Sequence, residues 1–91
     1  MFKNDLGINT ICTHTGAVED LTFGGAVSPL YLSTSYEFIN KDTKRYPRYF
    51  NTPNQEFLSK KIATLENSES ALIFSSGMAA FANVMLMVLK N

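Results

Sequence analysis

The sequence lacks several features that would point to particular classes of protein. Its single cysteine, Cys12, excludes an internal disulfide and fits a reducing compartment. Basic and acidic residues number eight each, so no positive excess favours nucleic acid or an anionic membrane surface as a partner. No apolar run reaches the roughly 20 residues that cross a bilayer, and no signal peptide is recognisable at the start. We therefore expect a cytoplasmic protein that binds neither nucleic acid nor membrane.

Histidine is almost as scarce as cysteine. His14 is the only one, and no second histidine or cysteine pair stands near it at the spacing of metal ligands. A lone histidine beside threonine and glycine is usually a hydrogen-bonded loop residue. We predict neither a metal site nor a catalytic role for His14.

The most informative stretch that is present lies near the end of the chain. Ala71 to Phe74 is a short apolar run of the kind found in strands buried on both faces. Ser75-Ser76-Gly77 is a turn signal, and Gly77 would allow either a positive φ or a close approach of the backbone to a ligand. From Met78 to Leu89 only Asn83 is polar, and most residues are strong helix formers. The pattern predicts strand, tight turn and helix.

Such a turn is a natural site for an anion. The first N–H groups of a helix have no intrahelical acceptor, and the helix dipole adds partial positive charge there. A phosphate group would satisfy both. The alternative interpretation is an ordinary connection between strand and helix in an α/β fold.

The predicted last helix also indicates that the chain is the N-terminal piece of a larger α/β protein. A helix that is apolar almost all round must be covered on nearly every side. A strand of a parallel sheet needs neighbours that are reached through crossovers. The upstream sequence supplies too few apolar segments for either.

The upstream sequence offers one clear helix and a long irregular stretch. Thr52, Pro53 and Gln55 form a helix start with a capping box, and an apolar stripe of Leu58, Ile62 and Leu65 follows it up to an end near Asn67-Ser68. A single helical turn is expected around Leu6 to Ile11. Residues 19–40 contain at best a weak strand, over 31–38, and are expected to be an arm ordered by a partner surface.

Between the arm and the clear helix lies Tyr46-Pro-Arg-Tyr-Phe-Asn51, in which three aromatic residues surround Arg48. Arginine and tyrosine dominate protein interfaces, and arginine is also suited to phosphate. The segment is therefore either an interface or anion-binding loop or a packed surface loop.

Taken together, five segments resemble the N-terminus of the Cys/Met-metabolism pyridoxal-phosphate (PLP) enzymes. This family includes cystathionine γ-synthase, cystathionine β- and γ-lyases, methionine γ-lyase and the homoserine-ester sulfhydrylases. Each segment alone is a weak signal, but their order and spacing cover nearly the whole chain. The segments are Thr13-His-Thr-Gly16, Ala26 to Phe38, Tyr46-x-Arg48, the helix ending in Ile62 to Glu66, and Ser75-Ser-Gly-Met-Ala-Ala80.

The resemblance implies a fold, a cofactor and a site. The fold is the large α/β aspartate-aminotransferase-type fold, with residues 1–51 as an N-terminal arm that reaches the neighbouring subunit and residues 52–91 as the start of the PLP-binding large domain. The family's phosphate loop falls on Ser76, Gly77 and Met78. Its Tyr-x-Arg pair falls on Tyr46 and Arg48, which would contact the PLP phosphate of the neighbouring subunit. The implied assembly is a homotetramer built as a dimer of dimers.

The chain departs from the family pattern at two places. Members usually continue Tyr-x-Arg with Asn-Pro-Thr, whereas this chain has Asn51-Thr52-Pro53, as if one residue were inserted. Several γ-acting members carry an acidic residue before the tyrosine, and this chain has Arg45. The resemblance therefore leaves the reaction subtype open.

The resemblance also implies that this chain has no catalytic residue of its own. In the family, the lysine that binds PLP covalently lies far downstream, and none of the six lysines here matches it. We expect the parent protein to be a PLP-dependent lyase or transferase acting on amino-acid substrates by β- or γ-elimination or γ-replacement. The competing hypothesis is a non-catalytic module that binds a phosphorylated ligand or a partner chain. A dinucleotide-binding enzyme is less favoured, because no Gly-x-Gly-x-x-Gly follows the predicted strand.

Overall fold

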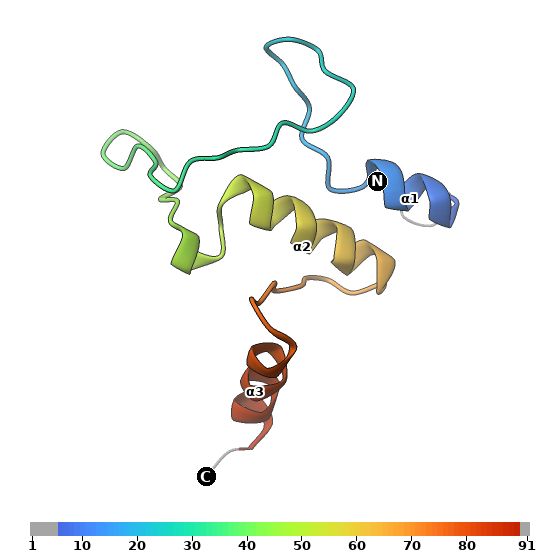
Figure 1. The fold of residues 1–91 in the computed structure, drawn as a ribbon, viewed down its shortest axis with the longest axis vertical. Helices are drawn as coiled ribbons and strands as arrows, with labels where there is room; N and C mark the ends of the chain where they lie inside the picture. The colour runs from blue at the N-terminus through green and yellow to red at the C-terminus, as the bar shows by residue number, and fades with distance from the viewer. Residues whose placement is uncertain (1–5, 90–91) are drawn as a thin grey trace.

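The computed structural model describes residues 6–89. Three α-helices and one short 3-10 helix lie in this range (Figure 1). In chain order they are α1 (Ile8–His14), η1 (Pro47–Tyr49), α2 (Pro53–Leu65) and α3 (Gly77–Val88). The turn expected around Leu6 to Ile11 is a longer helix that begins and ends later in the chain.

Helices α1 and α2 pack against each other, and within residues 6–89 they are the only two elements in mutual contact. Gly16, two residues after the end of α1, lies against the backbone of α2. Gly16 is buried and has a φ of +81°. A Cβ at this position would lie 2.4 Å from the carbonyl oxygen of Phe57 in α2. Only glycine permits this backbone conformation together with this approach. Ile11 and Ala63, the two buried apolar residues among those described, belong to these two helices.

Helix α2 begins as the sequence predicts but does not bury the predicted stripe. Thr52 and Gln55 form the capping box, with the Thr52 amide donating to Gln55 Oε1 at 3.1 Å. Leu58 and Ile62, however, are exposed, and Ala63 is the buried residue of the helix. Leu65, the third residue of the stripe, is half-buried, so the apolar stripe is present in the helix but is largely uncovered within residues 6–89.

The segment from 17 to 46 contains neither helix nor strand, and Figure 1 shows it as a long looping path. It is nevertheless attached to α2 at Tyr31 and, near its end, at Arg45. The side chain of Asn54 accepts a hydrogen bond from the Tyr31 amide (3.0 Å) and donates one to the Tyr31 carbonyl (2.6 Å). The Tyr31 ring meets the Phe57 ring edge to face, at 6.3 Å between centroids. The weak strand expected over 31–38 is absent.

The strand predicted over Ala71–Phe74 is also absent, and no strand occurs anywhere in residues 6–89. A strand exists only through hydrogen bonds to a neighbouring strand, and a parallel neighbour is reached through a crossover. No part of the described chain supplies that neighbour. The α/β architecture predicted for the parent protein is therefore not present within this chain by itself.

The chain is open rather than closely packed. Its radius of gyration is 15.6 Å, whereas a compact domain of this length has about 12 Å. Its accessible surface is 7848 Å², whereas a compact monomer of 10.1 kDa exposes about 5300 Å². Among the described side chains, none is fully buried. Much of the surface that a globular protein of this size would bury is therefore still accessible.

Helix α3 accounts for a large share of that accessible surface. It extends away from α1 and α2 (Figure 1), and every residue from 81 to 89 is exposed. Phe81, Val84, Leu86, Met87 and Val88 are all more than half exposed. The observation fits the expectation that this apolar helix needs other protein around it. No helix within residues 6–89 is both long and apolar enough to cross a membrane.

Candidate functional site

The first candidate site is the start of α3, where Ser76 caps the helix. Ser76 has extended backbone angles, and its Oγ accepts a hydrogen bond from the Ala79 amide at 3.1 Å. The Ala80 amide donates to the Ser76 carbonyl oxygen at 3.2 Å. The amides of Gly77 and Met78 have no acceptor among residues 6–89. Two adjacent N–H groups at the positive end of a 12-residue helix are thus free to bind an anion.

The position that a side chain of residue 77 would occupy is open. A Cβ at this residue would meet no atom within 4 Å, and Gly77 is not among the residues with positive φ. Of the two roles considered for this glycine, the structure therefore excludes a requirement for positive φ. Close approach of a ligand to the backbone is the role that remains.

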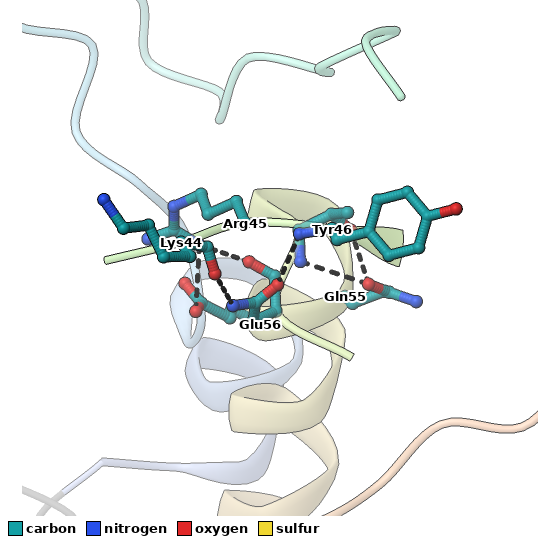
Figure 2. Close-up of polar contacts among 7 residues, drawn as sticks. Lys44, Arg45, Tyr46, Gln55 and Glu56 are labelled. Atoms are coloured by element: carbon teal, nitrogen blue, oxygen red, sulfur yellow. Dashed lines mark hydrogen bonds and ion pairs between the residues drawn. The ribbon is translucent and has the colours of Figure 1, made fainter. Parts of the chain in front are cut away.

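The second candidate site is the loop that contains Tyr46 and Arg48. Arg48 lies in η1, and Tyr46 is the residue directly before η1. Both side chains are exposed. The Tyr46 ring packs edge to face on Tyr49, at 5.4 Å between centroids, and its hydroxyl points away from α2 (Figure 2). Neither of the two ion pairs found among the described residues involves Arg48. Its guanidinium is therefore available to an anion.

Polar side chains hold this loop on the start of α2, as Figure 2 shows. Asn51 accepts from the Tyr46 amide at 3.0 Å and donates to the Lys44 carbonyl at 2.6 Å. Gln55 donates to the Pro47 carbonyl at 3.1 Å. Arg45 forms an ion pair with Glu56, with 2.9 Å between Nη1 and Oε1, and also donates to the Asn51 carbonyl.

The two candidate sites are joined indirectly. No hydrogen bond, ion pair or aromatic contact among residues 6–89 connects Tyr46 or Arg48 with Ser76, Gly77 or Met78. The nearest link is Phe50, whose ring lies 5.7 Å, centroid to centroid, from that of Phe74. Phe50 holds the left-handed conformation (φ 56°, ψ 29°), which is uncommon for a bulky residue. Within residues 6–89 the two candidate sites therefore make no direct contact with each other.

Sequence reasoning assigned only structural roles, or none, to the residues that hold the loop. Gln55 was predicted as part of the capping box, and Arg45 and Asn51 were noted only as family differences. The glutamate Glu56 gave no signal of its own. An arginine and a glutamate eleven residues apart carry no periodicity that would pair them, so only the folded loop reveals their contact.

His14 has no metal partners in the structure. It is the last residue of α1 and is exposed, and no group of three or more metal-ligating side chains occurs within residues 6–89. The prediction that His14 is a loop residue is therefore wrong, because it lies inside α1.

Comparison with known protein families gives a direct assignment. The family model for Cys/Met metabolism PLP-dependent enzymes matches residues 9–91. Because this match covers nearly the whole chain, the chain belongs to that family. The enzymes of the family depend on PLP as their cofactor. The assignment confirms the resemblance drawn from the five sequence segments.

Several curated relatives are similar along most of this chain. It is 33% identical to a canavanine γ-lyase of Pseudomonas canavaninivorans over 97% of its length, which is 24% of that protein. It is 31% identical to the cystathionine γ-synthase of Escherichia coli over 89% of its length, or 22% of that enzyme. It is 35% identical to the cystathionine γ-lyase of Saccharomyces cerevisiae over 84%, or 20% of that enzyme.

The chain thus spans less than a quarter of the length of these relatives. The relatives carry out different reactions according to their names, so similarity at this level identifies the family and not the reaction. No solved structure matches the chain significantly.

Proposed function

We propose that this chain is the N-terminal part of a PLP-dependent enzyme of sulfur amino-acid metabolism, and that the start of α3 binds the PLP phosphate. The observation that carries the proposal is the pair of amides of Gly77 and Met78 at a helix N-terminus, which have no acceptor among residues 6–89, together with the open space beside the Cα of Gly77. The residues present fit the group, because a phosphate dianion needs N–H donors and positive potential. The Ser76 hydroxyl, which accepts from Ala79, still has its own proton to donate to a phosphate oxygen.

The proposed protein has the aspartate-aminotransferase-type α/β fold. Residues 52–91 begin its large domain, and residues 1–51 form the arm. In this fold Ala71–Phe74 would pair with strands from the rest of the protein, which would also cover α3. The unpaired segment and the exposed apolar helix support this proposal, because both need partners that residues 6–89 do not contain.

Tyr46 and Arg48 are proposed to bind the PLP phosphate of a neighbouring subunit. Both side chains are exposed, form no ion pair or side-chain hydrogen bond among residues 6–89 and make no contact there with the Gly77 site. A dimer would bring them to a second phosphate, and two such dimers would form the expected tetramer. Arginine suits this role because its planar guanidinium can donate two parallel hydrogen bonds to a phosphate.

The cofactor supplies the chemistry, by withdrawing electrons from the carbons of a bound amino acid. The residues of this chain would bind and orient the phosphate and so fix the cofactor relative to the substrate. The lysine that binds PLP covalently is proposed to lie outside this chain, so these 91 residues alone should be inactive. The reaction class is β- or γ-elimination or γ-replacement on cystathionine-, homoserine-ester- or methionine-like substrates, in the cytoplasm.

The experiment that tests the site replaces Gly77 with valine in the full-length protein. Among residues 6–89 the added Cβ meets no atom within 4 Å, so the fold should survive, whereas a phosphate on the adjacent amides would be obstructed. We expect greatly weakened PLP binding, measured as cofactor retained during dialysis against cofactor-free buffer. No side chain can compensate, because the donors are backbone amides.

Ser75→Ala is the matched control, since Ser75 precedes the cap and contributes at most one neutral hydrogen bond of about 1 kcal/mol. If the Gly77→Val protein keeps PLP as firmly as the wild type, the phosphate binds elsewhere and the start of α3 is only a structural turn. The competing function, a non-catalytic binding module, would be favoured if the full-length protein bound phosphorylated ligands of unrelated structure equally well.

A further inference from the structure

The loop that carries Tyr46 and Arg48 has little to hold it except polar side chains from the start of α2 and from its own flanks. Its residues are mostly exposed, and η1 spans only Pro47–Tyr49. Phe50 ends η1 in a left-handed conformation that costs on the order of 1 kcal/mol or more. A loop of this kind keeps one shape only if other contacts impose it.

The contacts that impose it reach the backbone on both sides of Tyr46. Asn51 binds the Tyr46 amide and the Lys44 carbonyl, and Gln55 binds the Pro47 carbonyl. Three successive parts of the loop are thus tied to side chains at or near the N-terminus of α2. Because backbone groups are held, the directions in which residues 46 and 48 project are fixed together.

The ion pair of Arg45 and Glu56 completes this attachment. It is the shorter of the two ion pairs in residues 6–89, at 2.9 Å, and the Arg45 side chain is 30% exposed. The same guanidinium donates to the Asn51 carbonyl, so it braces the residue that binds the Tyr46 amide. Arg45 therefore points back to α2 and not outward with Tyr46, as Figure 2 shows.

We propose that Arg45, Asn51, Gln55 and Glu56 are positioning residues that fix Tyr46 and Arg48 for binding a phosphate. The inference rests on the proposed function of the Tyr46–Arg48 loop. It gives Arg45, the residue that differs from the acidic one of several relatives, a role in holding the loop and none in contacting substrate. Its clearest consequence is that the carboxylate of Glu56 strengthens the binding of an anion.

A substitution at Glu56 can distinguish a role in positioning the loop from a direct electrostatic effect on the phosphate. The variant Glu56→Arg adds positive charge near the loop, and by charge alone it would strengthen phosphate binding. If Glu56 acts by bracing Arg45, the same variant weakens binding, because two like charges then face each other. We expect the PLP dissociation constant of the full-length apoprotein to rise about twofold to fivefold, the range of a partly exposed ion pair. Equilibrium dialysis with PLP measures it.

The charge-swapped protein Arg45→Glu/Glu56→Arg should recover part of the affinity lost in either single variant, since the ion pair is restored in reverse while the hydrogen bond from Arg45 to the Asn51 carbonyl is not. The matched control is Glu37→Arg, which makes the same charge change in the exposed ion pair of Glu37 and Lys41 (3.6 Å) and should leave the dissociation constant unchanged. If Glu56→Arg does not fold, Arg45→Met removes the same pair with little change in shape and should show the same loss.

A double-variant cycle distinguishes positioning from general stabilisation. In a Tyr46→Phe/Arg48→Ala background, Glu56→Arg should cause no further loss of PLP affinity, because the groups that it positions are gone. Equal loss in both backgrounds, or tighter binding by Glu56→Arg, overturns the inference. If Arg48→Ala weakens PLP binding and Glu56→Arg does not, the inference alone fails. If Arg48→Ala has no effect, the proposed function of the loop fails.

Discussion

Helices α2 and α3 are nearly equal in length, 13 and 12 residues, but differ in what surrounds them. Helix α2 has α1 and the Gly16 turn against it, the arm attached at Asn54, and the Tyr46–Arg48 loop held at its start. Helix α3 is capped by Ser76 and is otherwise exposed along its second half. The comparison teaches that α2 organises the contacts within residues 6–89, whereas α3 presents an apolar surface that nothing in those residues covers.

The two regions differ for a physical reason. Most of α2's contacts are hydrogen bonds and close backbone approach, which act locally and need few apolar residues. Helix α3 offers almost only apolar side chains, each of which gains about 1.5–3 kcal/mol when fully buried. Until it is covered, that gain is not realised. In the full-length protein, burial of α3 should therefore contribute more to the free energy of unfolding than its few contacts within residues 6–89 indicate.

The largest expected effect tests whether Arg48 and Gly77 of one chain bind two different PLP molecules of a dimer. We expect Arg48→Ala in the full-length protein to keep its fold but to lose roughly thirtyfold to a few thousandfold in PLP affinity, as for removal of one partner of a buried charged hydrogen bond. Mixed with Gly77→Val protein, it should regain activity, because one site of each hybrid dimer would have both phosphate-binding pieces intact. Activity of the mixture after demonstrated subunit exchange is the measurement.

The expected recovery has a clear opposite. If Arg48 and Gly77 of one subunit bind the same cofactor, each site of a hybrid dimer carries one of the two substitutions. No site is then intact. Absence of recovery despite exchange would thus assign Arg48 to its own subunit.

The next largest effect concerns the contact between α1 and α2. It measures how much their close packing contributes to the stability of the protein. Gly16→Ala places a Cβ against the Phe57 carbonyl in a positive-φ backbone, so we expect a loss of about 3 kcal/mol or more in the stability of the full-length protein. Gly24→Ala is the control, because Gly24 also has positive φ (+66°) but no atom within 4 Å of its added Cβ. It should cost only about 1 kcal/mol. Thermal unfolding measures both, and equal losses would mean that the approach of α1 to α2 is unimportant.

A smaller effect concerns the exposed apolar surface of α3. Expressed alone, the 91-residue chain should self-associate, since a large apolar patch is rarely left open to water. Leu86→Lys should weaken this association by about 1.5–3 kcal/mol, whereas Leu21→Lys, an equally drastic change in the arm, should not. Leu86 and Leu21 are similarly exposed, at 77% and 85%, so a difference between the two variants would come from where each residue lies and not from how exposed it is. Sedimentation over a concentration series measures it, and a monodisperse monomer would contradict the prediction.

The smallest effect concerns a turn in the arm. The Phe23 amide, with those of Gly25 and Thr22, donates to the Asp20 carboxylate and holds the pKa of that carboxyl below its ordinary value. A depressed pKa stabilises the turn above the unfolded value of about 3.9, and this stabilisation is lost as pH falls through the folded pKa. Hydrogen exchange of the 18–28 segment, corrected for intrinsic rate, should therefore show protection at pH 4.5 that disappears at lower pH.

The variant Asp20→Asn is the control for this titration. It retains a neutral acceptor for two of the three amides, and its protection should be weaker and independent of pH across this window. A wild-type segment whose protection does not change with pH would show that the carboxylate does not hold the turn.

Much of the candidate site could be predicted from sequence, because its signals are local. Thr52, Pro53 and Gln55 lie within four residues and specify a helix start by their own hydrogen bonds. Ser76 acts in the same way at α3, where the predicted turn and helix lie within one residue of the observed ones. The family assignment also followed from short motifs in order. The roles of Ser76, Gly77, Met78, Tyr46 and Arg48 toward PLP stay predictions.

What the sequence alone determined, then, is where α2 and α3 begin and which residues could meet a phosphate, since capping and helix dipoles act within one turn of backbone. The tertiary structure decided what local signals do not contain. It brought Gly16 against Phe57, Asn54 to Tyr31 and Arg45 to Glu56, contacts between residues 11 to 41 positions apart. It also left Ala71–Phe74 without a ladder, because a strand is a property of two segments, and the second is not within residues 6–89.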